Sequence, residues 1–168
     1  MNIILIANIV SLIGSIIMVS VGFIQTKRNI LIAQSMQLTF MGIANLMLGG
    51  VTGFIADIVS VIRNITASKV IFTTKIKALF IILIIGVSLP FNTNGSLGLI
   101  PIICGIIFTL VLDQKDERIL KCAIIIAQVL FSIYDFCILN YTGFIFDILT
   151  IISNLIGIYM LFKNKRIS

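Results

Sequence analysis

Histidine and tryptophan are absent from the sequence, and charged residues are scarce. Only 11% of the 168 residues are charged, whereas 60% are hydrophobic. A water-soluble domain has too little interior to hide that much apolar material, so the composition excludes a soluble globular protein. Without histidine or a glycine-rich phosphate-binding loop, the chain gives no sign of a cofactor, a metal site or ATP-driven transport.

Cysteine is also rare, and its spacing indicates no site. Cys104, Cys122 and Cys137 stand singly inside apolar runs, so we expect them to pack as small apolar side chains. The twelve basic residues outnumber the six acidic ones. They form short clusters between apolar runs, which is typical of membrane flanks and not of a nucleic-acid-binding surface. We therefore expect the lipid bilayer as a partner, and no nucleic acid.

Long apolar runs make up most of the chain. Each is about the length that a helix needs to cross roughly 30 Å of hydrocarbon, and none alternates as the strands of a membrane barrel do. The first run follows no basic residue and is too long for a signal-peptide core, so we expect it to be retained as a span. The fourth and fifth runs are short, which leaves a re-entrant hairpin over residues 76–112 as an alternative. The seven runs cover residues 3–24, 30–48, 52–67, 76–91, 97–112, 119–139 and 141–162.

With seven spans, all the basic residues fall on one side of the membrane. By the positive-inside rule, this places the N-terminus outside and the C-terminus in the cytoplasm. Arg63 lies within the third span, and we expect it to snorkel to the cytoplasmic edge, with anion binding as the alternative. The basic residues are Lys27, Arg28, Arg63, Lys69, Lys75, Lys77, Lys115, Arg118, Lys121, Lys163, Lys165 and Arg166.

A fourteen-residue element occurs twice, ninety residues apart. Residues 51–64 read VTGFIADIVSVIRN and residues 141–154 read YTGFIFDILTIISN, with eight identities between them. Isoleucine-rich segments match by chance at apolar positions, but a carboxylate, an amide, a threonine and a glycine do not align by chance. The chain is therefore predicted to contain two copies of one unit.

The ninety-residue offset pairs spans one to three with spans five to seven and leaves the fourth span unmatched. Because the extra span restores the orientation of the second copy, we expect the copies to be parallel, related by a pseudo-twofold axis along the membrane normal. The predicted fold class is an all-α polytopic membrane protein, with seven transmembrane helices as two parallel three-helix bundles joined by a linker helix. The first repeat covers residues 1–69, the linker helix 70–91, and the second repeat with a short basic cytoplasmic tail 92–168. Pro101 is expected to bend the fifth span.

The repeated element places the same polar residues on one face of spans three and seven. A charge near the bilayer centre costs about 2.5–3.5 kcal/mol on insertion scales, so a carboxylate there needs a proton, a partner or water. Hydrogen bonding between packed helices is the alternative role for these residues. The predicted substrate-binding residues are Asp57, Asn64, Asp147 and Asn154, with Asn45 and Asp135, also ninety residues apart, behind them. No catalytic residue and no metal ligand is predicted.

The TGFIxDIxxxIxN element, the YDF sequence at residues 134–136 and the basic C-terminal end resemble the YgjV-type bacterial inner membrane proteins. The arrangement of three, one and three spans is similar to that of the SWEET (MtN3-like) sugar facilitators and the PnuC-type vitamin transporters. These resemblances imply a bacterial inner membrane location, a small polar solute held between two bundles, and Asn64 and Asn154 in the positions of the SWEET asparagines. The chain lacks a tryptophan to stack on a ring and a Pro-Gln pair in the first helix of either repeat, so a sugar is not implied.

The predicted function is transport of a small polar solute by alternating access between the two bundles, linked to protons or cations through the aspartates. The main alternative is a non-transporting membrane scaffold or accessory protein whose polar residues only hold helices together. An intramembrane aspartyl hydrolase is a lesser alternative, because the Gly-x-Gly-Asp element is missing. We therefore expect no enzymatic activity. The identity of the solute and the formation of a homodimer are left open.

Overall fold

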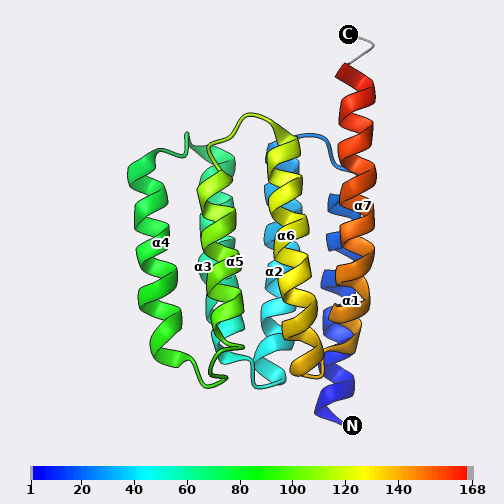
Figure 1. Cartoon of the computed structure of the whole chain (residues 1–168). Coiled ribbons are helices and arrows are strands. Elements are labelled where there is room, and N and C mark those ends of the chain that lie inside the picture. The colour runs from blue at the N-terminus through cyan, green and yellow to red at the C-terminus, as the bar shows by residue number, and fades with distance from the viewer. Residues whose placement is uncertain (1, 166–168) are drawn as a thin grey trace.

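The computed structural model describes residues 2–165, with side chains as far as residue 163, and contains helices but no strand over that range (Figure 1). This confirms the all-α prediction, and the predicted spans match the helices to within a few residues at each end. Arg166, the last basic residue of the predicted tail, lies outside the described residues. The elements are α1 (Ile3–Val21), α2 (Lys27–Met47), α3 (Val51–Lys69), α4 (Thr74–Ser88), the 3-10 turn η1 (Leu89–Phe91), α5 (Leu99–Val111), α6 (Glu117–Cys137) and α7 (Tyr141–Lys165).

Capping side chains define where several helices begin. The side chain of Asn2 accepts a hydrogen bond from the backbone N–H of Ile4 at the start of α1. At the start of α6, Asp116 accepts one from the N–H of Arg118 over 3.0 Å. Each cap satisfies one of the N–H groups that the first turn of a helix leaves without a partner.

The outside of the bundle is apolar and its inside is unusually polar. Large side chains such as Ile16, Ile62 and Ile152 are about half exposed on the outer faces, whereas many polar side chains are buried. Six of the described helices are long and apolar enough to cross a membrane. The shorter α5 has 13 residues and covers only about 20 Å at 1.5 Å per residue. This distribution fits lipid around the bundle, so the chain is a polytopic integral membrane protein.

The helices form two layers that meet at both edges (Figure 1). In one layer α2 packs between α1 and α3, and in the other α6 packs between α5 and α7. Helix α1 contacts α7 at one edge, and α3 contacts α5 at the other, where α4 covers both. Consecutive helices run in opposite directions, so the N-terminus and the end of α7 lie at opposite ends of the bundle.

Helices α4 and α5 run between the two ends of the bundle. The connection that joins them lies at the same end as the α2–α3 and α6–α7 connections (Figure 1). There the Thr52 hydroxyl, in the first turn of α3, donates to the carbonyl of Phe91 over 3.4 Å. This placement favours two crossings over the re-entrant hairpin.

The structure removes the reason for expecting a bend at Pro101. Pro101 is the third residue of α5, and the carbonyl four residues earlier belongs to Leu97, before the helix begins. No hydrogen bond within the helix is therefore lost, because the first-turn N–H groups have no intrahelical partner in any case.

Candidate functional site

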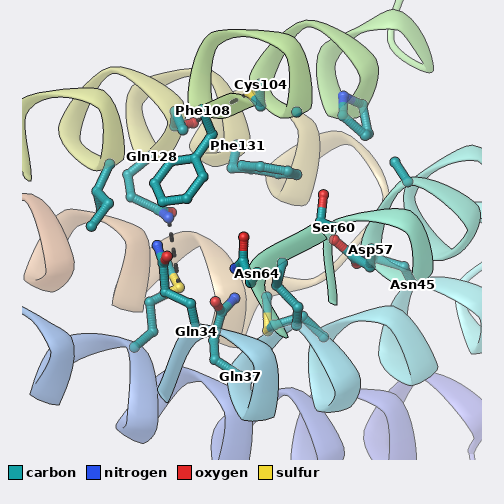
Figure 2. A pocket seen from close by; sticks show the side chains of 18 of the residues that line it. Gln34, Gln37, Asn45, Asp57, Ser60, Asn64, Cys104, Phe108, Gln128 and Phe131 are labelled. Carbon is teal, nitrogen blue, oxygen red and sulfur yellow. Dashed lines mark hydrogen bonds between the residues drawn. The ribbon is translucent and has the colours of Figure 1, made fainter. Parts of the chain in front are cut away.

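A cavity of about 60 Å³ lies between the two layers, midway along the helices (Figure 2). On this measure a water molecule needs about 10–15 Å³, so the cavity has room for several waters or a few ligand atoms. Gln34 and Gln37 on α2 lie across the cavity from Gln128 on α6 and Phe108 on α5. The polar and charged lining residues are Gln34, Gln37, Asn45, Asp57, Ser60, Arg63, Asn64, Gln128, Asp135 and Asp147.

Five of the six residues that the sequence selects line this one cavity. They come from four helices, and they are Asn45, Asp57, Asn64, Asp135 and Asp147. The sixth, Asn154, is buried elsewhere: its amide nitrogen donates to the carbonyl of Thr150 within its own helix, over 2.9 Å. The two polar stripes, which read as equivalent in the sequence, therefore occupy different surroundings.

In the first repeat the amide and the carboxyl group are bonded to each other. Nδ2 of Asn45 donates to Oδ2 of Asp57 over 3.0 Å, and both side chains are buried. Because only the amide nitrogen can donate, this bond fixes the orientation of Asn45. Its Oδ1 is left buried without a partner at the cavity.

In the second repeat the corresponding residues are two carboxyl groups, Asp135 and Asp147. Asn140 Nδ2 donates to Oδ2 of Asp135 over 3.1 Å, and Asn140 Oδ1 accepts from the backbone N–H of Gly143 over 3.1 Å. Oδ1 of Asp135 has no partner, and neither has either oxygen of Asp147, although both side chains are 1% exposed. Buried polar atoms in proteins nearly always have partners, so these three oxygens are free to accept hydrogen bonds from water or a ligand in the cavity.

The glycine of each repeat lets a helix approach the polar group of its neighbour. A Cβ at Gly143 would overlap the carboxylate of Asp135 and would lie 2.8 Å from its Cγ. A Cβ at Gly53 would lie 3.1 Å from Nδ2 of Asn45 and 2.6 Å from the hydroxyl of Tyr134. Since both distances are shorter than normal contacts, glycine at these positions keeps residues 45 and 135 in place.

Arg63 does not snorkel to the membrane edge, and this expectation is wrong. The side chain is 3% exposed, and Nη1 donates to the carbonyl of Gly105 over 2.8 Å and to the hydroxyl of Thr109 over 3.0 Å. Its guanidinium also lies 4.9 Å from the ring centroid of Phe108. Six residues separate Arg63 from the end of α3 at Lys69, about 9 Å of helix, and inward partners satisfy the charge at that depth.

The same guanidinium orients Asn64. Nε and Nη2 of Arg63 donate to Oδ1 of Asn64 over 3.1 and 3.0 Å. Because arginine has donors and no acceptor, the amide nitrogen of Asn64 must point away from it. That nitrogen is buried without a partner at the cavity. Asn64 thus presents a donor, whereas Asn45 presents an acceptor.

Two lysines at the opposite end from the N-terminus join the layers. Nζ of Lys121, on α6, donates to the carbonyls of Gly22 over 2.7 Å and Val21 over 3.2 Å at the end of α1. Nζ of Lys27, on α2, donates to the carbonyls of Leu112 and Gln114 just after α5. Helix C-termini carry partial negative charge, so both contacts are favourable. From the sequence, these two lysines indicate only which ends of the helices face the cytoplasm.

A surface ion pair joins α4 to the connection after α5 at this same end. Nζ of Lys77 lies 2.9 Å from Oδ2 of Asp113. Its hydrogen bond holds the pKa of the Asp113 carboxyl below the usual 3.8. The two side chains are 16% and 38% exposed, so water reaches this ion pair and its contribution to stability is small.

The comparisons with known proteins give a family and no closer relative. The model of the family described as bacterial inner membrane protein, Imp-YgjV, matches residues 5–165. No curated protein and no solved structure matches the chain.

Proposed function

Since the chain belongs to the Imp-YgjV family of bacterial inner membrane proteins, we propose that it carries a small polar solute across that membrane. The solute binds in the central cavity, at Asn64 and Asp147 with Asn45, Asp57 and Asp135 around them. The observation that carries this proposal is Asp147, whose carboxyl group is 1% exposed and has no hydrogen-bond partner on either oxygen. A carboxyl group is costly to bury without a partner inside a membrane-spanning bundle, and a ligand or coupling ion gives it one.

The two repeats form the moving bodies of this carrier. In this proposal the layer of α1 to α3 is one moving body, the layer of α5 to α7 is the other, and α4 links them. A pseudo-twofold axis along the bundle exchanges the bundles, which is consistent with α1 packing against α7 at one edge and α3 against α5 at the other. Rocking about the central cavity then opens it to each side of the membrane in turn.

Contacts at the two ends of the bundles serve as the gates. At the basic end, Lys121 and Lys27 each reach from one repeat to the end of a helix in the other. At the opposite end, Asn8 on α1 donates to the carbonyl of Leu139 over 3.2 Å and accepts from the N–H of Thr142 over 2.9 Å. The Asn8 and Lys27 contacts use exposed or partly buried polar atoms, which water can replace at little cost when a gate opens, whereas opening the basic end also exposes the fully buried Lys121 to water.

The membrane orientation follows from the charges. The described basic side chains near helix ends lie at the end of the bundle opposite the N-terminus, where α1, α3, α5 and α7 end. By the positive-inside rule this end is cytoplasmic, with the N-terminus outside. The aspartates of the cavity link transport to a proton or cation, because neighbouring carboxyl groups titrate as a coupled set.

The scaffold alternative expects each buried polar group to bond a neighbouring helix. The hydrogen bond from Asn45 on α2 to Asp57 on α3 fits that role. Asp147 does not fit it, which is why transport is preferred here.

Solute counterflow in proteoliposomes tests the proposal. The panel contains sugars, nucleosides, amino acids, vitamins and small amines, and wild type is compared with Asp147→Asn. Asn154→Ala is the matched control, because Asn154 is equally buried but does not line the cavity. We expect saturable exchange of one solute class in wild type and the control, and its loss in Asp147→Asn. Folded protein that exchanges nothing on the panel would favour the scaffold.

A further inference from the structure

We infer that the solute is a small organic cation with N–H groups, held by the carboxyl groups of Asp147 and Asp135. This inference rests on the proposed function, because it names the class of solute for the same cavity. Its basis is the set of buried polar atoms that the protein leaves without partners.

The partnerless atoms of the carboxyl groups, and of the amides whose orientation a hydrogen bond fixes, are mostly hydrogen-bond acceptors. Asp135 Oδ1 and both oxygens of Asp147 can only accept when the carboxyls are ionised. Asn45 Oδ1 is also an acceptor, because the nitrogen of that amide is bonded to Asp57. The single free donor of fixed orientation is Nδ2 of Asn64, among the described residues that line the cavity. A ligand that satisfies this set must therefore donate several hydrogen bonds and accept one.

The charges around the cavity also favour a cationic solute. Three carboxyl groups line it, those of Asp57, Asp135 and Asp147, against the one guanidinium of Arg63. That guanidinium already donates to Gly105, Thr109 and Asn64 and lies over Phe108. Because these contacts within the protein occupy the guanidinium, it is poorly placed to bind an anion. A cation with N–H donors balances the remaining carboxyl charge and makes charge-assisted hydrogen bonds.

Size and ligand geometry narrow the class further. The cavity of about 60 Å³ accommodates only a few non-hydrogen atoms in this conformation. Over the described residues, no group of three or more His, Cys, Asp or Glu side chains is arranged to hold a metal ion. A protonated amine, whose N–H groups reach out to separate acceptors, fits this lining better than a divalent cation, which needs its oxygen ligands gathered at one point.

Three probes of related structure test the inference by thermal unfolding of the full chain in detergent. Ethanolammonium carries a charge and N–H donors, ethylene glycol has similar size without the charge, and choline has the charge without N–H donors. We expect a saturable rise in Tm with ethanolammonium alone. A rise of equal size with ethylene glycol or choline would overturn the inference.

Variants locate the effect in the cavity. In Asp147→Asn the Kd for ethanolammonium is expected to rise about ten- to a hundredfold, as for loss of one charged hydrogen bond. Asp147→Glu should recover part of the affinity, and Asn154→Ala should bind as wild type. Should Asp147→Asn fail to fold, Asp135→Asn takes its place with the same expectation. Unchanged affinity in the folded aspartate variants would overturn the assignment.

The inference and the proposed function fail separately. If neutral solutes exchange but amines do not bind, the protein is still a carrier, and the inference that its solute is a cation is overturned. Ethanolammonium binding at Asp147 without exchange of any amine would leave the binding site intact and contradict transport.

Discussion

Nδ2 of Asn45 donates a hydrogen bond to Oδ2 of Asp57 over 3.0 Å, and ninety residues later the same two positions hold two carboxyl groups, Asp135 and Asp147. Replacing the amide by a carboxyl group removes the donor from the pair. Asn140 partly compensates by donating to Asp135, but Asp147 is left without a partner. The carboxyl group of Asp57 thus has a partner within its own repeat, whereas the carboxyl group of Asp147 has none.

This asymmetry predicts the effect of Asp135→Asn. The new amide can donate to Asp147 as Asn45 does to Asp57, and its oxygen can still accept from Asn140. We expect a gain of about 0.5–1.5 kcal/mol in the free energy of unfolding, together with weaker solute exchange. Chemical denaturation in detergent and counterflow measure the two effects, and a destabilised protein that still exchanges solute would contradict the argument.

Asn45→Ala should act in the opposite direction in the first repeat. The substitution removes the amide group that donates a hydrogen bond to Asp57, and Asp57 is only 4% exposed. Leaving a buried polar group unsatisfied costs about 1–3 kcal/mol. Thermal unfolding measures the loss, with Ser20→Ala as a control, since that hydroxyl is exposed and bonds only its own helix. Equal stability of the two variants would show that the pair is not a structural unit.

Two glycine substitutions should have opposite effects. Gly143→Ala places a methyl group on the carboxylate of Asp135 and should destabilise the fold by about 1–3 kcal/mol or more. Gly86→Ala in α4 meets no atom within 4 Å and should stabilise by up to about 1 kcal/mol, because alanine is the better helix former. Denaturation of both variants checks this, and a harmless Gly143→Ala would contradict the close packing of α7 on Asp135.

The lysine contacts should control access to the cavity from the basic end. Cys104 lines the cavity and is buried, whereas Cys122 and Cys137 are exposed. In a Cys122→Ser/Cys137→Ser background, Lys27→Met and Lys121→Met should each speed maleimide labelling of Cys104 several-fold.

Lys115→Met provides the control for that experiment. Lys115 lies at the same end but is exposed in a connection, so its removal should not change the labelling rate. Labelling rates that are alike in all three variants would exclude the lysines as a gate.

Periodicity and charge predicted the helices well, because long apolar runs in lipid have few alternatives to helix. The internal repeat also selected five residues that the fold brings to one cavity. Asn154 does not line the cavity with the other five residues. Two copies of a sequence repeat have equal surroundings only where the residues around them also repeat. Arg63 orients Asn64, but Ser153 stands in the corresponding place and donates to the carbonyl of Thr150.

The partners of Arg63 and Lys121 could not be predicted from the sequence. Arg63 bonds Gly105 and Thr109, more than forty residues away, and Lys121 bonds carbonyls about a hundred residues away. The positive-inside rule assigns such residues to a side of the membrane and says nothing about inward contacts. The depth of Arg63 within its predicted span was the available signal that it faces the interior.

Counterflow with Asn64→Ala and Asn154→Ala, measured side by side in proteoliposomes, shows whether solute exchange depends on this cavity. The two asparagines correspond in the repeat, and both are fully buried, but only Asn64 lines the cavity. We predict that exchange is lost or strongly reduced in Asn64→Ala and kept in Asn154→Ala. Equal exchange in the two variants, or none from folded wild-type protein, would contradict a carrier with its site in this cavity.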